Sequence, residues 1–349
     1  MKEKYLRTST GRIRLGIAGM GYWGPNLLRN FQELPQCQIH TLCDLDITKL
    51  KPFAQRIPGV KVTDNFQSLL VDSEIDAVVI VTPVNTHFAL ASKALLAGKH
   101  VMIEKPLAGS SREGQKLIDL AHRKSLILMV GHTFEYHPAV LKIEELIKKR
   151  ELGNLHYIDS VRVNLGRYQS DGRNVLWDLA PHDLSIILRW IGHMPVSVAA
   201  WGHAYIQKRV VDVAFVGLEF PEGTLAHIHV SWLSPAKIRR MTVVGSKKMI
   251  MYDDLDNLEK LKIADRSANL DPRSTEARID YRMGDIVSPH LAYREPLAKE
   301  CAHFVESIIT GKKPMTDGQC GNRVVKILEA AERSLGFGGK KIIFKAAPR

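Results

Sequence analysis

Short apolar runs alternate with amphipathic stretches along the first 131 residues of the chain. The runs have the length of buried strands and lie at Ile13–Gly19, Cys37–Cys43, Val60–Thr63, Asp76–Thr82, His100–Glu104 and Leu126–Gly131. The stretches between them have helical spacing, and the one at Thr86–Lys99 reaches Gly98, a common helix stop. Strands that alternate with helices predict right-handed crossovers and a parallel, doubly wound sheet.

The pattern changes after a helix predicted at Pro138–Leu152. Alternation of apolar and polar positions then predicts strands with one buried face. These strands are predicted within Leu155–Leu165, Val196–Ile206, Val211–Phe220, Gly223–Leu233, Arg239–Ser246 and Lys248–Asp254. Helical spacing returns at Glu295–Lys312 and Asn322–Gly339, whereas the polar stretch Asp265–Pro289 is expected to be an extended loop. The α/β chain therefore divides into a nucleotide-type domain, residues 1–132, and an α+β domain with a large, mostly antiparallel sheet, residues 133–349.

Composition and charge limit the class of protein. The 349 residues are 45% hydrophobic and carry a net charge of +12, which favours anionic partners. No aromatic residues interleave with basic clusters, so nucleic acid is not favoured; a phosphorylated small molecule and a merely solvated basic surface both stay open. The longest apolar run, Ala77–Val81, is too short for a membrane span. Four cysteines without metal spacing and a polar, basic N-terminus indicate a cytoplasmic protein.

A glycine motif follows the first predicted strand. Gly19, Gly21 and Gly24 form G-x-G-x-x-G between a strand and a helix, as a dinucleotide fingerprint requires. Asp44 ends the second strand, twenty residues after Gly24, where a carboxylate accepts ribose hydroxyls and repels a 2′-phosphate. No arginine follows directly, so NAD is favoured as the cofactor; a glycine-rich turn beside an unrelated surface aspartate is the alternative.

Two further strand ends carry unusual residues. Thr82–His87 follows the fourth strand, and Glu104–Pro106 follows the fifth. Ligands of open α/β sheets bind at the carboxyl ends of strands, so both loops are expected near the nicotinamide. Taken alone, the triplet would leave a solvated loop charge as the default interpretation of Lys105.

The stretch Asn174–Trp190 combines an apolar helix with a polar opening turn. Apolar residues recur at three- and four-residue spacing from Leu184 on. Aspartate is a preferred helix cap and proline is tolerated in a first turn, so with Pro181 present the helix is expected to begin near Asp178. His182 lies four residues later on the same face, where the helix dipole favours its unprotonated form. Asp178 is therefore a cap, a catalytic residue or both.

Four motifs occur in a fixed order: the glycine motif with Asp44, T-P-x-x-x-H at Thr82–His87, E-K-P at Glu104–Pro106 and D-x-x-x-H at Asp178–His182. Together they resemble the Gfo/Idh/MocA oxidoreductase family over nearly the whole chain. The resemblance implies an N-terminal Rossmann domain and a C-terminal domain whose open sheet serves oligomerisation. It also implies a catalytic group, which corresponds here to Lys105, Asp178 and His182.

Four segments look like family members that act on nucleotide sugars, including 3-dehydrogenases of UDP-N-acetylglucosamine and of its uronic acid. They are Val130–Val140, Glu151–Ile158, Val175–Ile186 and Glu295–Ile308. Members with other substrates often carry three glycines ahead of the aspartate. Asn174–Trp177 stand there in this chain, so its pocket is expected to differ from those of the inositol and glucose–fructose branches.

The resemblance implies hydride transfer from a sugar carbinol to NAD. Such a reaction needs a base, a role that suits His182, and a positive field for the alkoxide, which Lys105 supplies. Asp178 either orients the imidazole or contacts the hydroxyl. The candidate cofactor-binding residues are Gly19, Gly21, Tyr22, Trp23, Gly24, Asp44, Thr82, Pro83, Asn85, His87, Glu104 and Lys105. The candidate substrate-binding residues are Lys105, Tyr136, His137, Arg162, Arg167, Arg173, Asn174, Trp177, Asp178 and His182; the three arginines are equally well interpreted as solvated, and His227 and His229 as solvent-facing residues of one strand face.

The leading hypothesis is NAD-dependent oxidation of the 3-hydroxyl of a UDP-N-acetylhexose. A ketoreductase on a nucleotide-linked keto sugar and an inositol or free-sugar dehydrogenase are the enzymatic alternatives. A dinucleotide-sensing protein without catalysis is the third. The expected partners are a nucleotide sugar and further copies of the chain, in a homo-dimer or homo-tetramer, without nucleic acid, membrane or metal.

Overall fold

The computed structural model describes residues 11–166, 168, 173–270 and 278–344. The chain folds into two compact units. The first consists of residues 1–136 and 294–326, and the second of residues 137–293 and 327–349. The chain first passes from the first unit to the second at residue 136, four residues after the predicted domain boundary at 132. The return of residues 294–326 to the first unit was not predicted from the sequence. An apolar helix face in that segment packs against the first unit and accounts for the return.

The first unit contains a parallel sheet of six described strands in the order β3-β2-β1-β4-β5-β6. Its strands are β1 (Ile13–Ala18), β2 (Cys37–Cys43), β3 (Lys61–Thr63), β4 (Ala77–Ile80), β5 (His100–Glu104) and β6 (Leu128–Gly131). This order reverses beside β1, and the predicted doubly wound parallel sheet is confirmed. The carboxyl ends of β1, β4 and β5 therefore carry the loops with the candidate cofactor residues.

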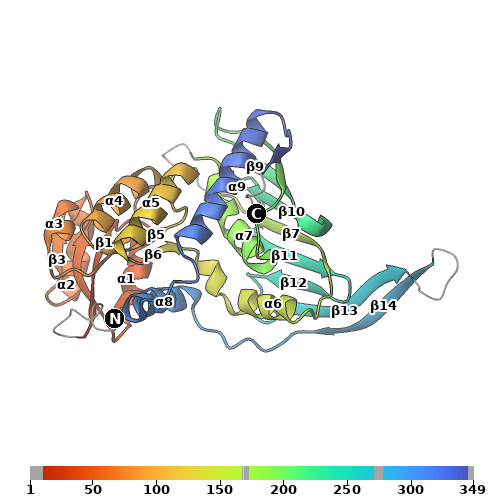
Figure 1. Ribbon diagram of the computed structural model, residues 1–349, viewed down its shortest axis with the longest axis horizontal. Helices are drawn as coiled ribbons and strands as arrows, with labels where there is room; N and C mark the ends of the chain where they lie inside the picture. The colour runs from red at the N-terminus through yellow and green to blue at the C-terminus, as the bar shows by residue number, and fades with distance from the viewer. Residues whose placement is uncertain (1–10, 167, 169–172, 271–277, 345–349) are drawn as a thin grey trace. The chain divides into compact units, whose positions relative to one another are not determined.

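The helices of the first unit are α1 (Gly24–Gln32), α2 (Lys51–Arg56), α3 (Gln67–Val71), α4 (Val84–Leu96), α5 (Ser111–Lys124), α8 (Pro296–Thr310) and the start of α9 (Gly318–Gly336). Helices α4 and α5 pack side by side, and α1 packs against α8 (Figure 1). The contact between α1 and α8 includes the edge-to-face rings of Phe31 and Phe304, whose centroids are 6.3 Å apart. Gly98, at φ +78°, follows α4 at the predicted stop.

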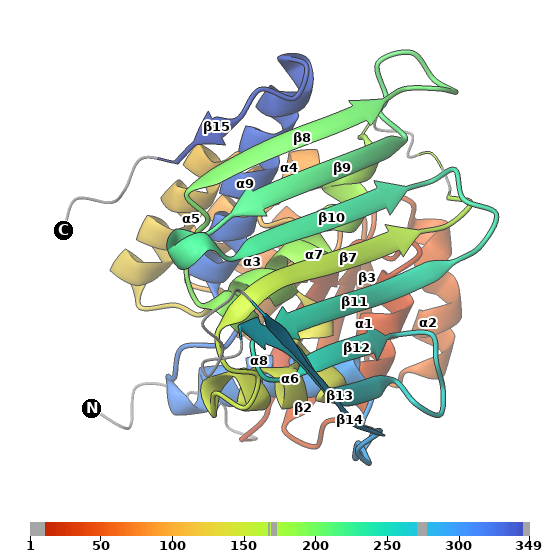
Figure 2. The same cartoon turned by 90° about the vertical axis from the view of Figure 1, so that its right-hand side faces the viewer.

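The second unit contains a sheet of nine described strands in the order β14-β13-β12-β11-β7-β10-β9-β8-β15 (Figure 2). Its strands are β7 (Leu155–Val163), β8 (Ser197–His203), β9 (Val213–Glu219), β10 (Leu225–Ser231), β11 (Ile238–Gly245), β12 (Met249–Asp253), β13 (Leu261–Leu270), β14 (Ile279–Val287) and β15 (Ile342–Ile343). Only β7 and β10 pair in parallel among these described strands, so the predicted mostly antiparallel sheet is confirmed. Helices α6 (Pro138–Lys148) and α7 (Val175–Ile191) complete the unit, and α7 covers one sheet face.

The prediction of an extended loop at Asp265–Pro289 is wrong for its described part. Strands β13 and β14 pair there as an antiparallel ribbon. Nearly every residue of β14 is exposed, so the strand lacks the apolar alternation that a half-buried strand requires. Periodicity therefore gave no signal for it.

Candidate active site

The three motif glycines each meet a different steric demand. Gly19 has φ +99°, and a β-carbon there would lie 2.5 Å from the carbonyl oxygen of Val81. A β-carbon on Gly24 would collide with the carbonyl oxygen of Gly19, whereas one on Gly21 would meet open space. A tight turn, close packing of the helix and an open face for pyrophosphate are what the dinucleotide motif needs. The structure thus fits NAD at this loop.

Helix α1 begins at the glycine motif, and Pro25 in its first turn has no N–H to donate. Trp23 occupies the N-cap position and accepts no side-chain capping bond. The first N–H groups of a helix attract anions, and the nine residues of α1 make a full helix end. Tyr22, in the same loop, is 89% exposed, so its ring is available to a ligand.

Asp44 joins the glycine loop to the end of β2. Its Oδ2 accepts a hydrogen bond from the backbone of Met20 at 2.7 Å, and its Oδ1 accepts one from Asp46 at 2.9 Å. These bonds fix the carboxylate at the strand end, where ribose hydroxyls are bound in dinucleotide folds. The Lys49 ammonium lies 3.4 Å from Oδ1. Sequence analysis missed Lys49, because it comes five residues after Asp44 and reaches back through a short 3₁₀ turn, Ile47–Leu50.

His87 holds two loops of the first unit together. Its ring is buried, with Nδ1 2.8 Å from the carbonyl oxygen of Pro106 and Nε2 2.8 Å from that of Thr82. The Thr82 hydroxyl in turn lies 2.6 Å from the Thr86 hydroxyl. The structure therefore gives His87 a positioning role between the loops after β4 and β5. Pro83 and Asn85 are exposed at the start of α4.

Lys105 follows β5 and belongs to the first unit. The peptide bond that joins it to Pro106 is cis. Its backbone N–H donates to the Glu104 carboxylate at 3.2 Å, and the Trp23 indole also donates to that carboxylate. Glu104 therefore connects the glycine loop to the Glu-Lys-Pro turn. This gives it an internal role in place of the direct cofactor contact that the sequence suggested.

Helix α7 of the second unit begins earlier than predicted. Asn174 is the N-cap, and its side chain accepts a hydrogen bond from the Trp177 backbone at 3.2 Å. The expectation that Asp178 caps the helix is therefore wrong: Asp178 lies within the first turns, and Pro181 is inside the helix rather than in its first turn. Asn174 also donates to Glu332 at 3.1 Å, so both polar ends of its amide have protein partners.

Asp178 has a partner that is distant in sequence. The indole N–H of Trp232, just after β10, donates to Asp178 Oδ2 at 3.2 Å. Trp232 is buried; Gly166 packs on its ring without room for a β-carbon, and the Tyr168 ring crosses it edge to face. The Tyr168 hydroxyl donates a hydrogen bond to Asp212 at 3.0 Å, and this bond fixes the Tyr168 ring beside Trp232. His182 follows Asp178 by one helical turn, so the two side chains share a helix face.

Several predicted substrate residues have structural roles instead. Arg162 is 4% exposed and forms a bidentate ion pair with Asp183, with nitrogen–oxygen distances of 2.8 and 3.1 Å. Tyr136 is buried between His303 and Thr316, where burial raises the pKa of its phenol. We therefore remove Arg162 and Tyr136 from the substrate site.

The remaining predicted substrate residues differ in what the structure shows of them. His137 caps α6 and packs against Tyr252, so we also remove it from the substrate site. Trp177 is buried in α7, and Arg173 is half-buried just before it. Arg167 lies outside the described residues.

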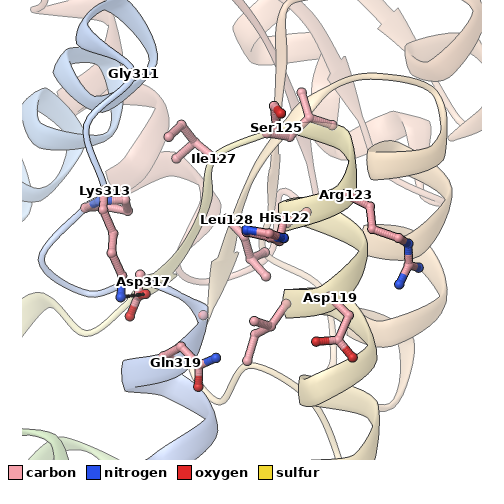
Figure 3. Close-up of a pocket in the computed structure, with 15 residues that line it drawn as sticks. Asp119, His122, Arg123, Ser125, Ile127, Leu128, Gly311, Lys313, Asp317 and Gln319 are labelled. Atoms are coloured by element: carbon pink, nitrogen blue, oxygen red, sulfur yellow. Dashed lines mark ion pairs between the residues drawn. The ribbon is translucent and has the colours of Figure 1, made fainter.

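A cavity of about 760 Å³ lies in the first unit, away from the dinucleotide loop (Figure 3). It is bounded by the end of α5, the residues before β6 and the segment 311–319, with the ion pair of Lys313 and Asp317 at 2.7 Å. The amino end of β6 faces it, whereas the glycine loop follows the carboxyl end of β1. The cavity is therefore separate from the cofactor residues.

No helix in the described part of the chain has the length and apolar character needed to cross a membrane.

Two family models match the chain in succession. Residues 13–132 match the oxidoreductase family with an NAD-binding Rossmann fold, and residues 140–251 match the GFO/IDH/MocA C-terminal domain. The first match covers the glycine loop, Asp44 and Lys105, and the second covers Asp178 and His182.

Named relatives share most of this length. The chain is 32% identical over 313 residues to a UDP-N-acetylglucosamine 3-dehydrogenase of Acidithiobacillus ferrooxidans, which covers 90% of this chain and 94% of that protein. The solved structure of the A. ferrooxidans enzyme GnnA superposes with a TM-score of 0.77 at 29% identity, over 93% of this chain and 99% of that one. A myo-inositol 2-dehydrogenase of Thermotoga maritima is 23% identical, over 93% of this chain and 96% of that protein.

Proposed function

The chain belongs to the Gfo/Idh/MocA family of oxidoreductases, and from that premise we propose that it oxidises the 3-hydroxyl of a UDP-N-acetylhexose with NAD. The observation that carries the proposal is the 32% identity, over nearly the whole chain, to a UDP-N-acetylglucosamine 3-dehydrogenase. The bound NAD supplies the hydride acceptor. The chain must supply a proton acceptor and a positive field for the alkoxide.

We assign these roles to Lys105 of the first unit and to Asp178 and His182 of the second. His182 accepts the hydroxyl proton, because an imidazole titrates near neutral pH. The Lys105 ammonium stabilises the developing alkoxide. Asp178, held by Trp232, orients the imidazole or accepts directly from the substrate hydroxyl. Arg173, which precedes the helix, and Arg167 stay our candidates for the diphosphate.

The substrate proposal is tested by mass spectrometry of the product. Purified protein is incubated with NAD and UDP-N-acetylglucosamine, and with its uronic acid, in the presence of a carbonyl-trapping hydrazine that draws the equilibrium forward. We expect a hydrazone at C3, formed with loss of water from a ketone that is itself two hydrogens lighter than the substrate. Absence of a trapped 3-keto product from every UDP-hexose would overturn the substrate class.

The T. maritima relative motivates the rival, an inositol or free-sugar dehydrogenase. A panel of inositols and free hexoses, assayed by NADH formation, separates the two. A higher kcat/KM for an unphosphorylated polyol than for any UDP sugar would favour the rival. The reverse assay, with NADH and the isolated keto product, reports the ketoreductase alternative.

The catalytic assignments predict a separation of turnover from cofactor binding. Lys105→Ala and His182→Ala should each lower kcat by about 10²-fold or more, because each removes a group that acts in the transition state. NADH affinity, measured by fluorescence, should stay within a few-fold of the wild type. The exposed residues Lys93 and His156 provide matched controls, and alanine at either should leave both quantities unchanged. Wild-type turnover in both site variants would contradict the roles.

We also propose that the chain forms a homo-dimer or homo-tetramer through the second unit. The face of the nine-stranded sheet opposite α7 carries large side chains that are exposed: Tyr157, Trp201, Phe215, Leu225 and Met251. An apolar patch of this kind is typical of an interface. A second copy of the same face would cover it with closed symmetry.

A further inference from the structure

Helix α8 supplies the first unit with two glutamates that have opposite surroundings. Glu295, just before the helix, forms a half-exposed bidentate pair with Arg29 of α1, with distances of 2.6 and 3.1 Å. Glu300, one turn and a half later, is fully buried. Its Oε2 accepts a hydrogen bond from the Thr133 hydroxyl at 2.7 Å. The first glutamate anchors the helix, but that anchor does not explain why the second carboxyl is inside the unit.

The carboxyl of Glu104 lies at the same end of β6 as Thr133. Glu104 pairs with Gly131 across β5 and β6, and a β-carbon on Gly131 would stand 2.9 to 3.1 Å from the carboxyl atoms of Glu104. Thr133, the partner of Glu300, follows Gly131 by two residues. The two carboxyls therefore converge on one short segment after β6.

Each of these carboxyls has an oxygen without a hydrogen-bond partner among the described residues. Glu104 Oε1 and Glu300 Oε1 are both buried and unpartnered. A buried carboxylate with an unsatisfied oxygen is costly, and two charged neighbours would also repel each other. A proton on one of the two groups removes one of the two charges and with it their mutual repulsion.

The other titratable groups near the pair do not supply a neutralising charge for both carboxyls. Lys105 is the cation that acts on Glu104, and Glu135 adds a further negative field at Glu300. Burial and the nearby Lys105 ammonium lower the pKa of His132 to about 3, so this ring is neutral. The pair also faces the phenol of Tyr136 and the thiol of Cys301, and burial raises the pKa of both.

The pKa shifts of Glu104 and Glu300 are both upward, which agrees with this geometry. Burial raises the pKa of Glu104 to about 7, although Lys105 and the hydrogen bonds from the Lys105 backbone and Trp23 oppose the rise. Burial also raises the pKa of Glu300 well above its ordinary range, and the charge of Glu104 adds to the effect. The Glu104 anion is stabilised by the Lys105 ammonium and by two donors, whereas Glu300 has the Thr133 donor and feels the negative field of Glu135. Glu300 is therefore the group that keeps its proton when Glu104 ionises.

We propose that Glu104 and Glu300 form a buried carboxyl pair that holds one proton and one charge at neutral to mildly alkaline pH. Glu300 holds the proton, and Glu104 is the positioning residue, because it holds the charge. That charge binds the Trp23 indole and the Lys105 backbone, so it couples the glycine loop to the Glu-Lys-Pro turn. The inference rests on the NAD half of the proposed function and is independent of the sugar.

The proton itself is tested by infrared spectroscopy and by thermal unfolding. At pH 8, the difference spectrum between wild type and Glu300→Gln should contain the C=O stretch of one protonated carboxylic acid. Between the ordinary pKa of glutamate and the raised value, the unfolded chain binds fewer protons than the folded one, so stability falls as pH rises. The unfolding temperatures of wild type and Glu300→Gln should therefore be similar at pH 5, with the variant higher at pH 8.5.

The positioning role is tested by NADH affinity between pH 6 and 9. In wild type, protonation of Glu104 weakens its bond from Trp23, so we expect NADH to bind about three- to tenfold more weakly at pH 6 than at pH 8.5. Glu104→Gln should bind weakly at every pH, without the transition. Glu300→Gln should keep the transition, because Glu104 still ionises. Glu306→Gln, an exposed position on the same helix, is the matched control.

Three outcomes would overturn the pair: no acid band in the difference spectrum, an unfolding-temperature difference that is the same at pH 5 and 8.5, or a pH transition that survives in Glu104→Gln. If Glu300→Gln does not fold, the acid band is sought in Glu104→Gln, where Glu300 keeps its proton and the band should shift. None of these measurements uses a sugar substrate. Failure here is therefore distinguishable from failure of the proposed reaction.

Discussion

Asp178 depends on a residue that lies 54 positions later in the chain. The Trp232 indole donates to one carboxylate oxygen of Asp178, for which we propose a catalytic role. A buried donor with a fixed ring orients a carboxylate better than water can, because it does not reorganise during the reaction. Trp232 thus acts through Asp178.

Trp232→Phe keeps the aromatic packing but removes the donor. We expect kcat to fall about tenfold, because Asp178 loses the indole donor that helps to orient it, while KM for NAD stays near the wild-type value. Trp190→Phe is the matched control, since the Trp190 indole donates to the carbonyl oxygen of Val140 at 3.0 Å in the same unit. An equal loss of kcat in both variants would indicate general destabilisation.

Residue chemistry could be predicted from sequence only where the backbone itself imposes it. Gly19 and Gly24 are such positions, because φ or close packing leaves no room for a β-carbon, whereas Gly21 faces open space and its role as a cofactor residue stays a prediction. The partner of a charged side chain could not be predicted: Arg162 was a candidate for a diphosphate and proved to pair with Asp183. A charge in a sequence does not indicate whether its counterion belongs to the protein or to a ligand.

At the scale of elements, one buried ion pair attaches α7 to the sheet. Arg162 of β7 reaches Asp183 of α7, and Ser160 donates to the same carboxylate at 3.0 Å. Asp183 follows His182 directly, so this attachment also fixes the rotation of the helix that carries both catalytic candidates. Its energetic contribution depends on both partners being present.

Arg162→Ala should lower the free energy of unfolding by about 3–5 kcal/mol, since it leaves a buried carboxylate unpaired. Arg162→Met with Asp183→Leu should cost less, because no charge is left buried. The control is Arg240→Ala, which breaks an exposed pair with Asp253 on the same sheet and should cost about 1 kcal/mol or less. Chemical denaturation of the wild type and the three variants measures the free energies of unfolding. Equal losses of stability in Arg162→Ala and Arg240→Ala would contradict the prediction.

Element existence could be predicted better than element boundaries. Most strands of the first unit are buried runs, the short β3 excepted, and most strands of the second alternate, so their periodicity is visible. Strand β14 is exposed along nearly its whole length and was missed, together with the exposed end of β13 that pairs with it. The start of α7 was misplaced because asparagine and aspartate cap equally well, and Pro181 lies deeper in the helix than proline usually does.

At the scale of the whole molecule, the open sheet face determines whether the chain acts alone. Phe215 lies within this face, 38% exposed, with its ring stacked on His229 at a centroid distance of 4.4 Å. A stacked aromatic is a rigid anchor for an interface. Its cross-strand partner on β8 is the exposed Trp201, so two aromatic rings lie together on the face of the proposed interface.

Phe215→Glu should convert the proposed dimer or tetramer to a monomer, because association would bury two unpaired carboxylates. Light scattering after size-exclusion chromatography measures the mass. Leu96→Glu, at an exposed apolar position of the first unit, is the control and should leave the mass unchanged. A monomeric wild type, or an unchanged mass in Phe215→Glu, would refute the interface.

The return of α8 to the first unit has a consequence for biosynthesis. Leu297, Cys301 and Phe304 belong to the same core as the strands of the amino-terminal sheet, but the ribosome makes them some 160 residues after β6. Contacts this distant in sequence form late and slow folding. The nucleotide-binding unit therefore remains incomplete until the second unit has been synthesised. A fragment that ends at residue 136 would expose that core and aggregate, so the two units cannot be separated by a single cut.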